Sequence, residues 1–203
     1  MRHFFIIIVL VLLLPQGVTA APAGDLSAFL ARLERRVAQI SDFSCDFRQE
    51  RHLKLFSRPV VFFGKLTVAR PRRLSWATTA PLASRLVINQ ERGFRCVDGQ
   101  AHDFDLSADP VMAAVSRQMW SFLSGSFASL PAGWVIEMAG PDTVAITPAA
   151  GGLFARIVVS FDPKELRPRR VRLFQGNGDE TVITFSRYRA GEAEAFKGCG
   201  EGM

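Results

Sequence analysis

The stretch RPVVFFGKLTVARPRRLSWATTAPLASRLVI, from Arg58 to Ile88, decides the fold that the rest of the chain is expected to adopt. From Val60 to Val68, apolar side chains occupy every second position, apart from one glycine in the series. They would therefore lie on one face of a strand, which is typical of a half-buried strand. The same alternation returns around Trp76, after the Arg70-Pro71 step, and again after the Ala80-Pro81 step. Because proline removes a ladder donor and restricts the residue before it, both steps are predicted to be strand junctions.

Two amphipathic helices and further strands are predicted around this stretch. Apolar residues at helical spacing from Leu26 to Ile40 indicate one helix. Asp109-Pro110, an N-cap followed by proline, begins a second helix whose apolar stripe runs to Leu123. Alternation elsewhere brings the expected total to about eleven strands, and their short connections imply an antiparallel sheet.

The predicted fold class is mainly β with helices (α+β). A sheet of about eleven strands must curl, so we expect a curved antiparallel sheet forming an open half-barrel. The two helices would then serve as a lid over an apolar cavity. A filled barrel or sandwich without a cavity is the alternative, because small barrels are often packed solid.

The order of features in the opening stretch resembles the LolA-like family of periplasmic lipoprotein carriers. Its most specific part is Gly64 to Pro81, with Ala69-Arg70-Pro71 and Leu74-Ser75-Trp76 inside it, and a weaker likeness extends from about Leu26 to about Tyr188. The resemblance implies a half-barrel that holds the acyl chains of lipoproteins. The tail from Ala190 to Met203 lacks the phenylalanine-rich strand and Pro-Gly-Val ending of that family.

Candidate site residues follow from the strand and helix periodicities. We expect the concave face of the sheet to present the acyl-chain cavity and the helices to present their apolar stripes to it. The cavity candidates are Phe47, Phe62, Leu66, Val68, Leu74, Trp76, Leu86 and Ile88. The lid candidates are Leu30, Leu33 and Val37 in the first helix and Met112, Val115 and Met119 in the second.

Arg70 is the candidate latch of this lid. It shares the parity of Leu74 and Trp76 and is expected to point into the hollow, where an unpaired guanidinium is costly. The carbonyls at the end of a lid helix can supply acceptors for its five N–H donors. The family resemblance implies a similar role, in which this arginine holds the lid when the carrier is empty. A solvated arginine is the alternative.

The amino terminus has the pattern of a secretory signal peptide. Arg2 and His3 precede the apolar run Phe4 to Leu14, and Val18-Thr19-Ala20 resembles a cleavage site. Residues 1–20 are therefore expected to be removed, leaving one carrier domain at residues 21–190 and an irregular tail at residues 191–203. The expected location is the periplasm. Cys45, Cys96 and Cys199 can form at most one internal disulfide in that compartment, and their spacing does not choose the pair.

No constellation of catalytic residues is found in the sequence. His102 and Asp103 are neighbours in an expected strand and so face opposite ways, and there is no G-x-S-x-G elbow, C-x-x-C pair, zinc motif or phosphate-binding loop. We therefore predict a non-enzyme without cofactor or metal. The formal charge of +6 suits acidic lipid headgroups in an exported protein. The cluster Arg167, Arg169, Arg170 and Arg172 is either a binding surface or a guard against edge pairing.

The predicted function is a monomeric periplasmic carrier of acyl chains that makes transient membrane contact and binds no nucleic acid. By resemblance, its cargo is lipoprotein, received from an inner-membrane ABC transporter and passed to an outer-membrane acceptor. A relative that carries another lipid and an interaction module with a solid core are the two alternatives. Burial of aliphatic chains is non-directional, so the apolar residues do not identify the cargo.

Overall fold

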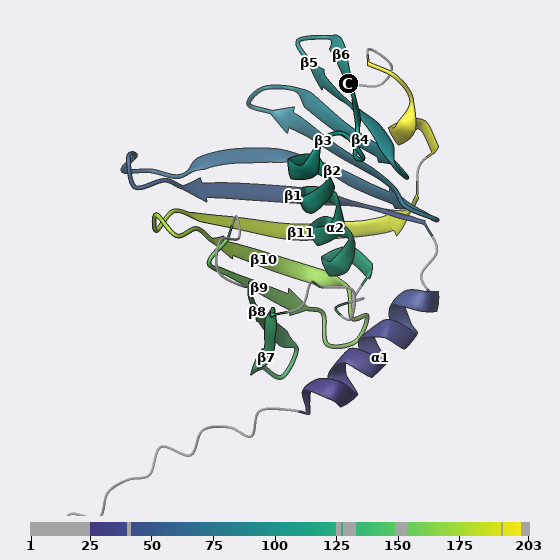
Figure 1. Cartoon of the computed structure of the whole chain (residues 1–203). Helices are drawn as coiled ribbons and strands as arrows, with labels where there is room; N and C mark the ends of the chain where they lie inside the picture. Colours follow the sequence, from purple (N-terminus) through teal and green to yellow (C-terminus); the bar gives the residue numbers. More distant parts are fainter. Residues whose placement is uncertain are drawn as a thin grey trace, which may run out of the picture.

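The computed structural model describes residues 25–39, 42–124, 127, 133–148, 154–191 and 193–199. Its main element is an 11-stranded sheet in the order β6-β5-β4-β3-β2-β1-β11-β10-β9-β8-β7, and every pair of neighbours is antiparallel (Figure 1). The end strands β6 and β7 do not pair with each other, so the sheet is open and the predicted half-barrel is confirmed. The strands are β1 (Phe43–His52), β2 (Val60–Ala69), β3 (Arg73–Ala80), β4 (Ser84–Asn89), β5 (Arg92–Val97), β6 (Gln100–Asp105), β7 (Val135–Gly140), β8 (Thr143–Thr147), β9 (Arg156–Phe161), β10 (Pro168–Phe174) and β11 (Glu180–Ala190).

The first and last strands of the chain meet in the middle of this sheet. β1 pairs with β2 on one side and with β11 on the other, where the register runs from Phe43 opposite Ala190 to His52 opposite Glu180. The Ser44 hydroxyl donates to the carbonyl of Ala190, 146 positions later. Two meanders of consecutive hairpins are thus joined through one long-range pairing.

Two helices, α1 (Leu26–Gln39) and α2 (Pro110–Ser124), begin at aspartate caps. Asp25 Oδ1 accepts a hydrogen bond from the Ser27 amide at 2.9 Å, and Asp109 Oδ1 accepts one from the Met112 amide at 2.9 Å, which confirms the predicted start of α2. Figure 1 shows α2 crossing the middle of the sheet and α1 at one end of the strands. Neither helix in the described part of the chain has the length and apolar character needed to cross a bilayer.

The two proline steps lie where the sequence predicts them. Arg70-Pro71 separates β2 from β3, Ala80-Pro81 follows the end of β3, and both peptide bonds are cis. Across β3, Leu74 faces Val68 and Ile88, and Trp76 faces Leu66 and Leu86. The register therefore places these six cavity candidates on one face of the sheet.

Gly64 leaves room on the concave face for an aromatic stack. A Cβ atom at this position would lie 2.1 Å from the Ala77 carbonyl oxygen and 2.4 Å from the Phe47 ring. Phe47 is the residue directly opposite in β1, and its ring stacks on Trp76 with centroids 4.1 Å apart. Only a glycine permits this close approach of strand and ring.

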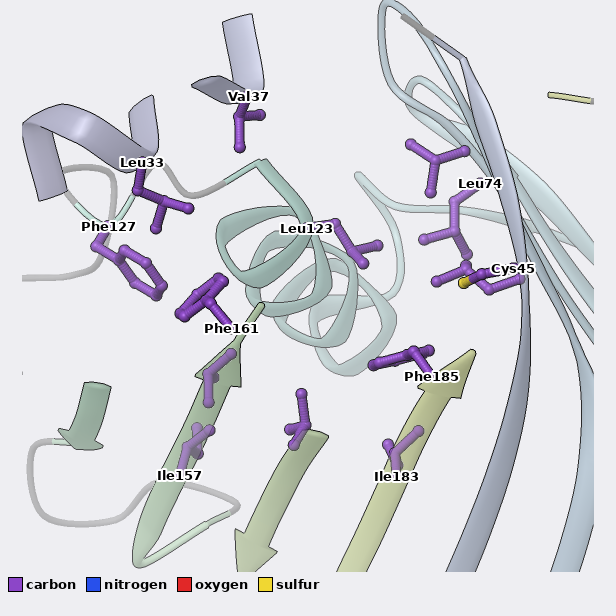
Figure 2. Close-up of a cluster of buried hydrophobic side chains, with 14 of the residues drawn as sticks. Leu33, Val37, Cys45, Leu74, Leu123, Phe127, Ile157, Phe161, Ile183 and Phe185 are labelled. Carbon is purple, nitrogen blue, oxygen red and sulfur yellow. The ribbon is translucent and has the colours of Figure 1, made fainter. Parts of the chain in front are cut away.

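The core lies between the concave face and the two helices. Figure 2 shows Leu74, Phe185 and Phe161 from the sheet around α2, with Leu33 and Val37 approaching from α1. Cys45 is also buried here and forms no disulfide, so it packs as a small apolar side chain.

A disulfide fastens the tail to the sheet. Cys96 in β5 bonds to Cys199, a pair that the cysteine spacing left open. The tail, expected to be irregular, contains the short 3-10 helix η2 (Ala193–Phe196), and the guanidinium of Arg73 in β3 lies 4.2 Å from the centroid of the Phe196 ring. The predicted signal peptide, residues 1–20, lies outside the described residues.

Candidate functional site

A cavity of about 420 Å³ opens between the C-terminal half of α1, the β2–β3 turn, the end of α2 and the β9–β10 connection. This volume falls within the range of ligand pockets, about 300 to 1,000 Å³. Its walls are mainly apolar, and their apolar members are Val37, Ala38, Phe43, Val68, Pro71, Trp120, Leu123, Leu166 and Pro168. Tyr188 and the charged residues Glu34, Arg70, Arg72 and Arg167 complete the lining.

Arg70 lies at the rim of this pocket and contacts α1. Its Nη2 donates to the Val37 carbonyl at 2.5 Å, and its backbone N–H donates to Asp42 Oδ1 at 2.9 Å. The residue as a whole is exposed, but its side chain lines the cavity, and the hydrogen bond to Val37 is partly buried. Its acceptor is a carbonyl at the end of α1, the kind of partner expected for this arginine from the sequence. Its role as a latch stays a prediction.

Two further arginines connect α1 to the β7–β8 turn and to the β9–β10 connection. Arg32 pairs with Asp142 at 3.2 Å, and Arg36 forms an ion pair with Glu165, whose backbone carbonyl also accepts from Arg36 Nε at 3.3 Å. Sequence reasoning assigned no role to these side chains because their partners are more than a hundred residues away. Such exposed pairs contribute about 0 to 1 kcal/mol each, so α1 is only lightly attached along this edge.

The predicted cavity residues lie in two environments. Val68 lines the 420 Å³ cavity. Leu66, Leu74 and Ile88 are completely buried in the core cluster that also contains Met112 and Leu123 of α2. Phe47 is buried, Trp76 and Leu86 are partly buried against that core, and Phe62 is partly buried near the outer end of β2. Ligand contact by these residues remains a prediction that requires α2 to move.

The predicted lid residues lie on the inner sides of the helices where their side chains are described. Leu33, Val37 and Met112 are buried, and Leu30 and Met119 are partly buried against the core. The side chain of Val115 lies outside the described part of α2. Val37 alone among the described lid candidates also lines the cavity.

A half-buried polar group, Tyr188, lines the pocket. Tyr188 donates its hydroxyl to the Pro168 carbonyl at 2.5 Å, and the Arg167 guanidinium lies 5.2 Å from the centroid of its ring. Burial raises the pKa of Tyr188 and raises the pKa of the neighbouring Cys45 thiol to about 12. Both groups are therefore neutral at physiological pH.

The arginine cluster of the sequence is divided by the fold. Arg167 precedes β10 and lines the pocket, whereas Arg169, Arg170 and Arg172 are exposed. Arg172 also pairs with Glu180 at 2.6 Å. The spacing of the four arginines did not indicate that Arg167 has a different environment from the other three. The only nearby feature in the sequence that distinguishes it is the proline that follows it. Among the described residues, no group of three or more His, Cys, Asp or Glu is arranged to hold a metal ion.

Solved structures share this architecture at low sequence identity. An uncharacterized conserved protein from Thermus thermophilus aligns with a TM-score of 0.52 and 11% identity, over 83% of this chain and 90% of that chain. MucB aligns with a TM-score of 0.50 and 17% identity, over 89% of this chain and 65% of that chain. A LolA superfamily protein from Nitrosomonas europaea has a TM-score of 0.44 and 8% identity, over 85% and 97% of the two chains. At their low identities, the first two of these structures show a likeness of fold alone.

Family membership comes from the sequence of the domain itself. No curated protein matches the chain significantly. The family described as "Outer membrane lipoprotein carrier protein LolA" matches residues 38–198, a span that contains every strand of the sheet, α2 and Cys96 of the disulfide. Because this match covers most of the chain, the protein belongs to the LolA family of outer membrane lipoprotein carrier proteins.

Proposed function

We propose that the protein is a periplasmic, non-enzymatic carrier that holds the acyl chains of lipoproteins and moves them from the inner to the outer membrane. The observation that carries this proposal is the apolar cavity between α1, α2 and the sheet, with the Arg70–Val37 contact at its rim. Membership of the LolA family supports lipoprotein as the cargo. The predicted signal peptide supports the periplasmic location.

The pocket is better suited to binding an acyl chain than to catalysing a reaction of that acyl chain. Burying aliphatic surface gains about 25 cal/mol per Å², without any requirement for direction. The buried thiol beside this region, Cys45, has its pKa raised to about 12, so its nucleophilic thiolate is scarce near neutral pH.

Loading requires the helices to separate from the sheet. The completely buried Leu66, Leu74 and Ile88 become available to a chain only when α2 moves away from them. The few exposed ion pairs and the Arg70 bond that attach α1 suit such a movement. Cargo then shifts the equilibrium toward the open form by binding it more tightly than the closed form.

One end of the molecule suits contact with a membrane. The turn between β1 and β2 extends beyond its neighbours (Figure 1), and Leu55 and Phe56 in it are 86% and 54% exposed. Lys54 and Arg58 beside them are exposed cations that anionic lipid headgroups attract. We infer that this hairpin end touches the bilayer during loading or release, and that an inner-membrane ABC transporter and an outer-membrane acceptor are the protein partners.

The proposal is tested by identifying what the mature protein carries. Protein purified from the periplasm is examined by native mass spectrometry, and its bound material is extracted and analysed as intact lipids and acylated peptides. Stoichiometric intact acyl species are expected. Catalytic release of cleaved acyl products, or a protein that stays empty when acylated lipoprotein is added, would exclude the carrier.

A further inference from the structure

The apolar pocket contains a cation for which the described residues supply no acidic partner. Arg167 lines the cavity, and its Nε is shielded from solvent without a hydrogen-bond acceptor among those residues. The residue is only partly exposed. Placing a charged group in apolar surroundings is unfavourable unless a counter-charge or hydrogen bonds compensate it.

Other arginines near this pocket do have acceptors. Arg72 pairs with Glu91 at 3.3 Å, and Arg70 donates to the Val37 carbonyl. Glu34 also lines the cavity, yet it forms no ion pair with Arg167 in the described part of the chain. Three guanidinium groups and one carboxylate therefore surround the cavity, which leaves its lining positive.

The fold holds Arg167 in place. Its guanidinium lies over the Tyr188 ring, and the Tyr188 hydroxyl is anchored on the carbonyl of Pro168, the residue that follows Arg167. A planar guanidinium held in one orientation can present two N–H groups to a carboxylate or phosphate. The arrangement is thus organised for an anion before one binds.

We propose that Arg167 forms an anion subsite in this pocket, which takes the carboxylate or phosphate head of an amphiphile whose acyl chain lies against the apolar wall. The inference rests on the proposed function, because it assumes that an acyl chain enters the cavity. It predicts that the pocket prefers acyl cargo with a negative group near the chain, either on the lipid or on the attached peptide. Arg70 and Arg72 strengthen the local positive potential, and Arg167 makes the direct contact.

The test compares ligands that share one chain and differ in the head. Binding of dodecanoate, dodecyl phosphate, dodecanol and dodecyltrimethylammonium to the mature protein is measured by calorimetry below their micellar concentrations. We expect both anions to bind at least about tenfold more tightly than dodecanol, a difference of about 1.4 kcal/mol, and the cation to bind most weakly. The tighter of the two anions identifies a carboxylate or a phosphate as the preferred head. Added salt should reduce the advantage of the anions.

Variants assign the effect to the subsite. Arg167→Gln should remove the preference for anions while dodecanol binds as before, and Arg167→Lys should retain part of it. Arg169→Gln, which removes an exposed arginine two residues away, should leave the preference unchanged. The comparison of heads on the wild-type protein does not depend on whether any variant folds.

The possible failures are distinguishable. Equal affinity for dodecanoate and dodecanol in the wild-type protein would overturn the anion subsite and leave the carrier intact. A preference for anions that survives in Arg167→Gln would also overturn it. If none of the four compounds binds, the carrier function fails and the subsite fails with it.

Discussion

The Nη2 of Arg70 donates a hydrogen bond to the carbonyl oxygen of Val37 at 2.5 Å, although the two residues are 33 positions apart. Val37 belongs to the last turn of α1, where carbonyls have no acceptor role within the helix itself. The Arg70 amide also donates to Asp42, which follows the helix. These contacts attach the end of α1 to the β2–β3 turn beside the cavity.

Replacing Arg70 by leucine should slow release of cargo. The variant loses the hydrogen bond that favours the empty, closed form, and it makes the rim more apolar. A hydrogen bond to a charged group contributes about 1.5 to 3 kcal/mol, so hand-off is expected to slow by more than about tenfold while uptake survives. A transfer assay from loaded carrier to acceptor membranes, with occupancy measured in parallel, checks this. Arg72→Leu is the control, because Arg72 pairs with Glu91 on the sheet side of the turn. Equal transfer by Arg70→Leu and wild type at equal occupancy would exclude the latch.

Replacing Trp76 by alanine should weaken acyl-chain binding and leave a folded protein. The side chain is partly exposed and stacks on Phe47, so its removal should cost less than the about 3 to 5 kcal/mol of a fully buried aromatic residue. Ligand titration and urea unfolding measure the two effects separately. Trp134→Ala removes another partly buried tryptophan, at the start of the β7 edge. That variant should keep its affinity. A loss of stability in Trp76→Ala without a loss of affinity would make Trp76 a packing residue only.

Replacing Gly64 by alanine should destabilise the sheet. The new methyl would lie 2.1 Å from a backbone oxygen of β3, which a side-chain rotation cannot relieve. We expect a loss of about 1 to 3 kcal/mol, measured by urea unfolding. Gly176→Ala is the matched control, since no atom lies within 4 Å of the added Cβ there. Unchanged stability of Gly64→Ala would show that β2 and β3 can separate at this point without cost.

The buried thiol of Cys45 should make the protein less stable at high pH. Burial raises its pKa from 9.0 to about 12, so the folded state keeps the proton that the unfolded chain releases. This contribution is fully present below about pH 9 and is lost as the pH rises to about 12. Urea unfolding of wild type and Cys45→Ala across this window measures the difference. Tyr188 titrates in both proteins, so a difference that does not change with pH would contradict the prediction.

Charges at the end of the β1–β2 hairpin should abolish membrane contact. Glutamate in place of Leu55 or Phe56 removes exposed apolar surface and is repelled by anionic headgroups. Sedimentation with anionic vesicles should show at least about a tenfold loss of binding, with dodecanoate affinity unchanged. Val135→Glu, at a residue 58% exposed on the β7 edge, is the control. Equal vesicle binding by all three variants would place the contact elsewhere.

The sequence alone determined the local elements of this protein. Alternation around Val68 and Trp76, the two proline steps and the Asp109 cap correspond to the observed strands, junctions and helix start. These features depend on residues that are close together in the sequence. Their backbone preferences, and the alternation of their side chains between the two faces of a strand, can be read directly from the sequence. Curvature followed from the number of strands, because a large twisted sheet with short connections has to curl.

Only the tertiary structure decided which distant residues share the pocket. The pairing of β1 with β11, the Cys96–Cys199 disulfide and the position of Arg167 over Tyr188 depend on register between segments far apart in the chain. Periodicity predicts which face of a strand a residue occupies, but it does not predict which distant residue it contacts. From the sequence, Arg167 therefore could not be distinguished from its exposed neighbours. The case for an anion in the pocket depends on the end of β11, which places Tyr188 against Arg167 and Pro168.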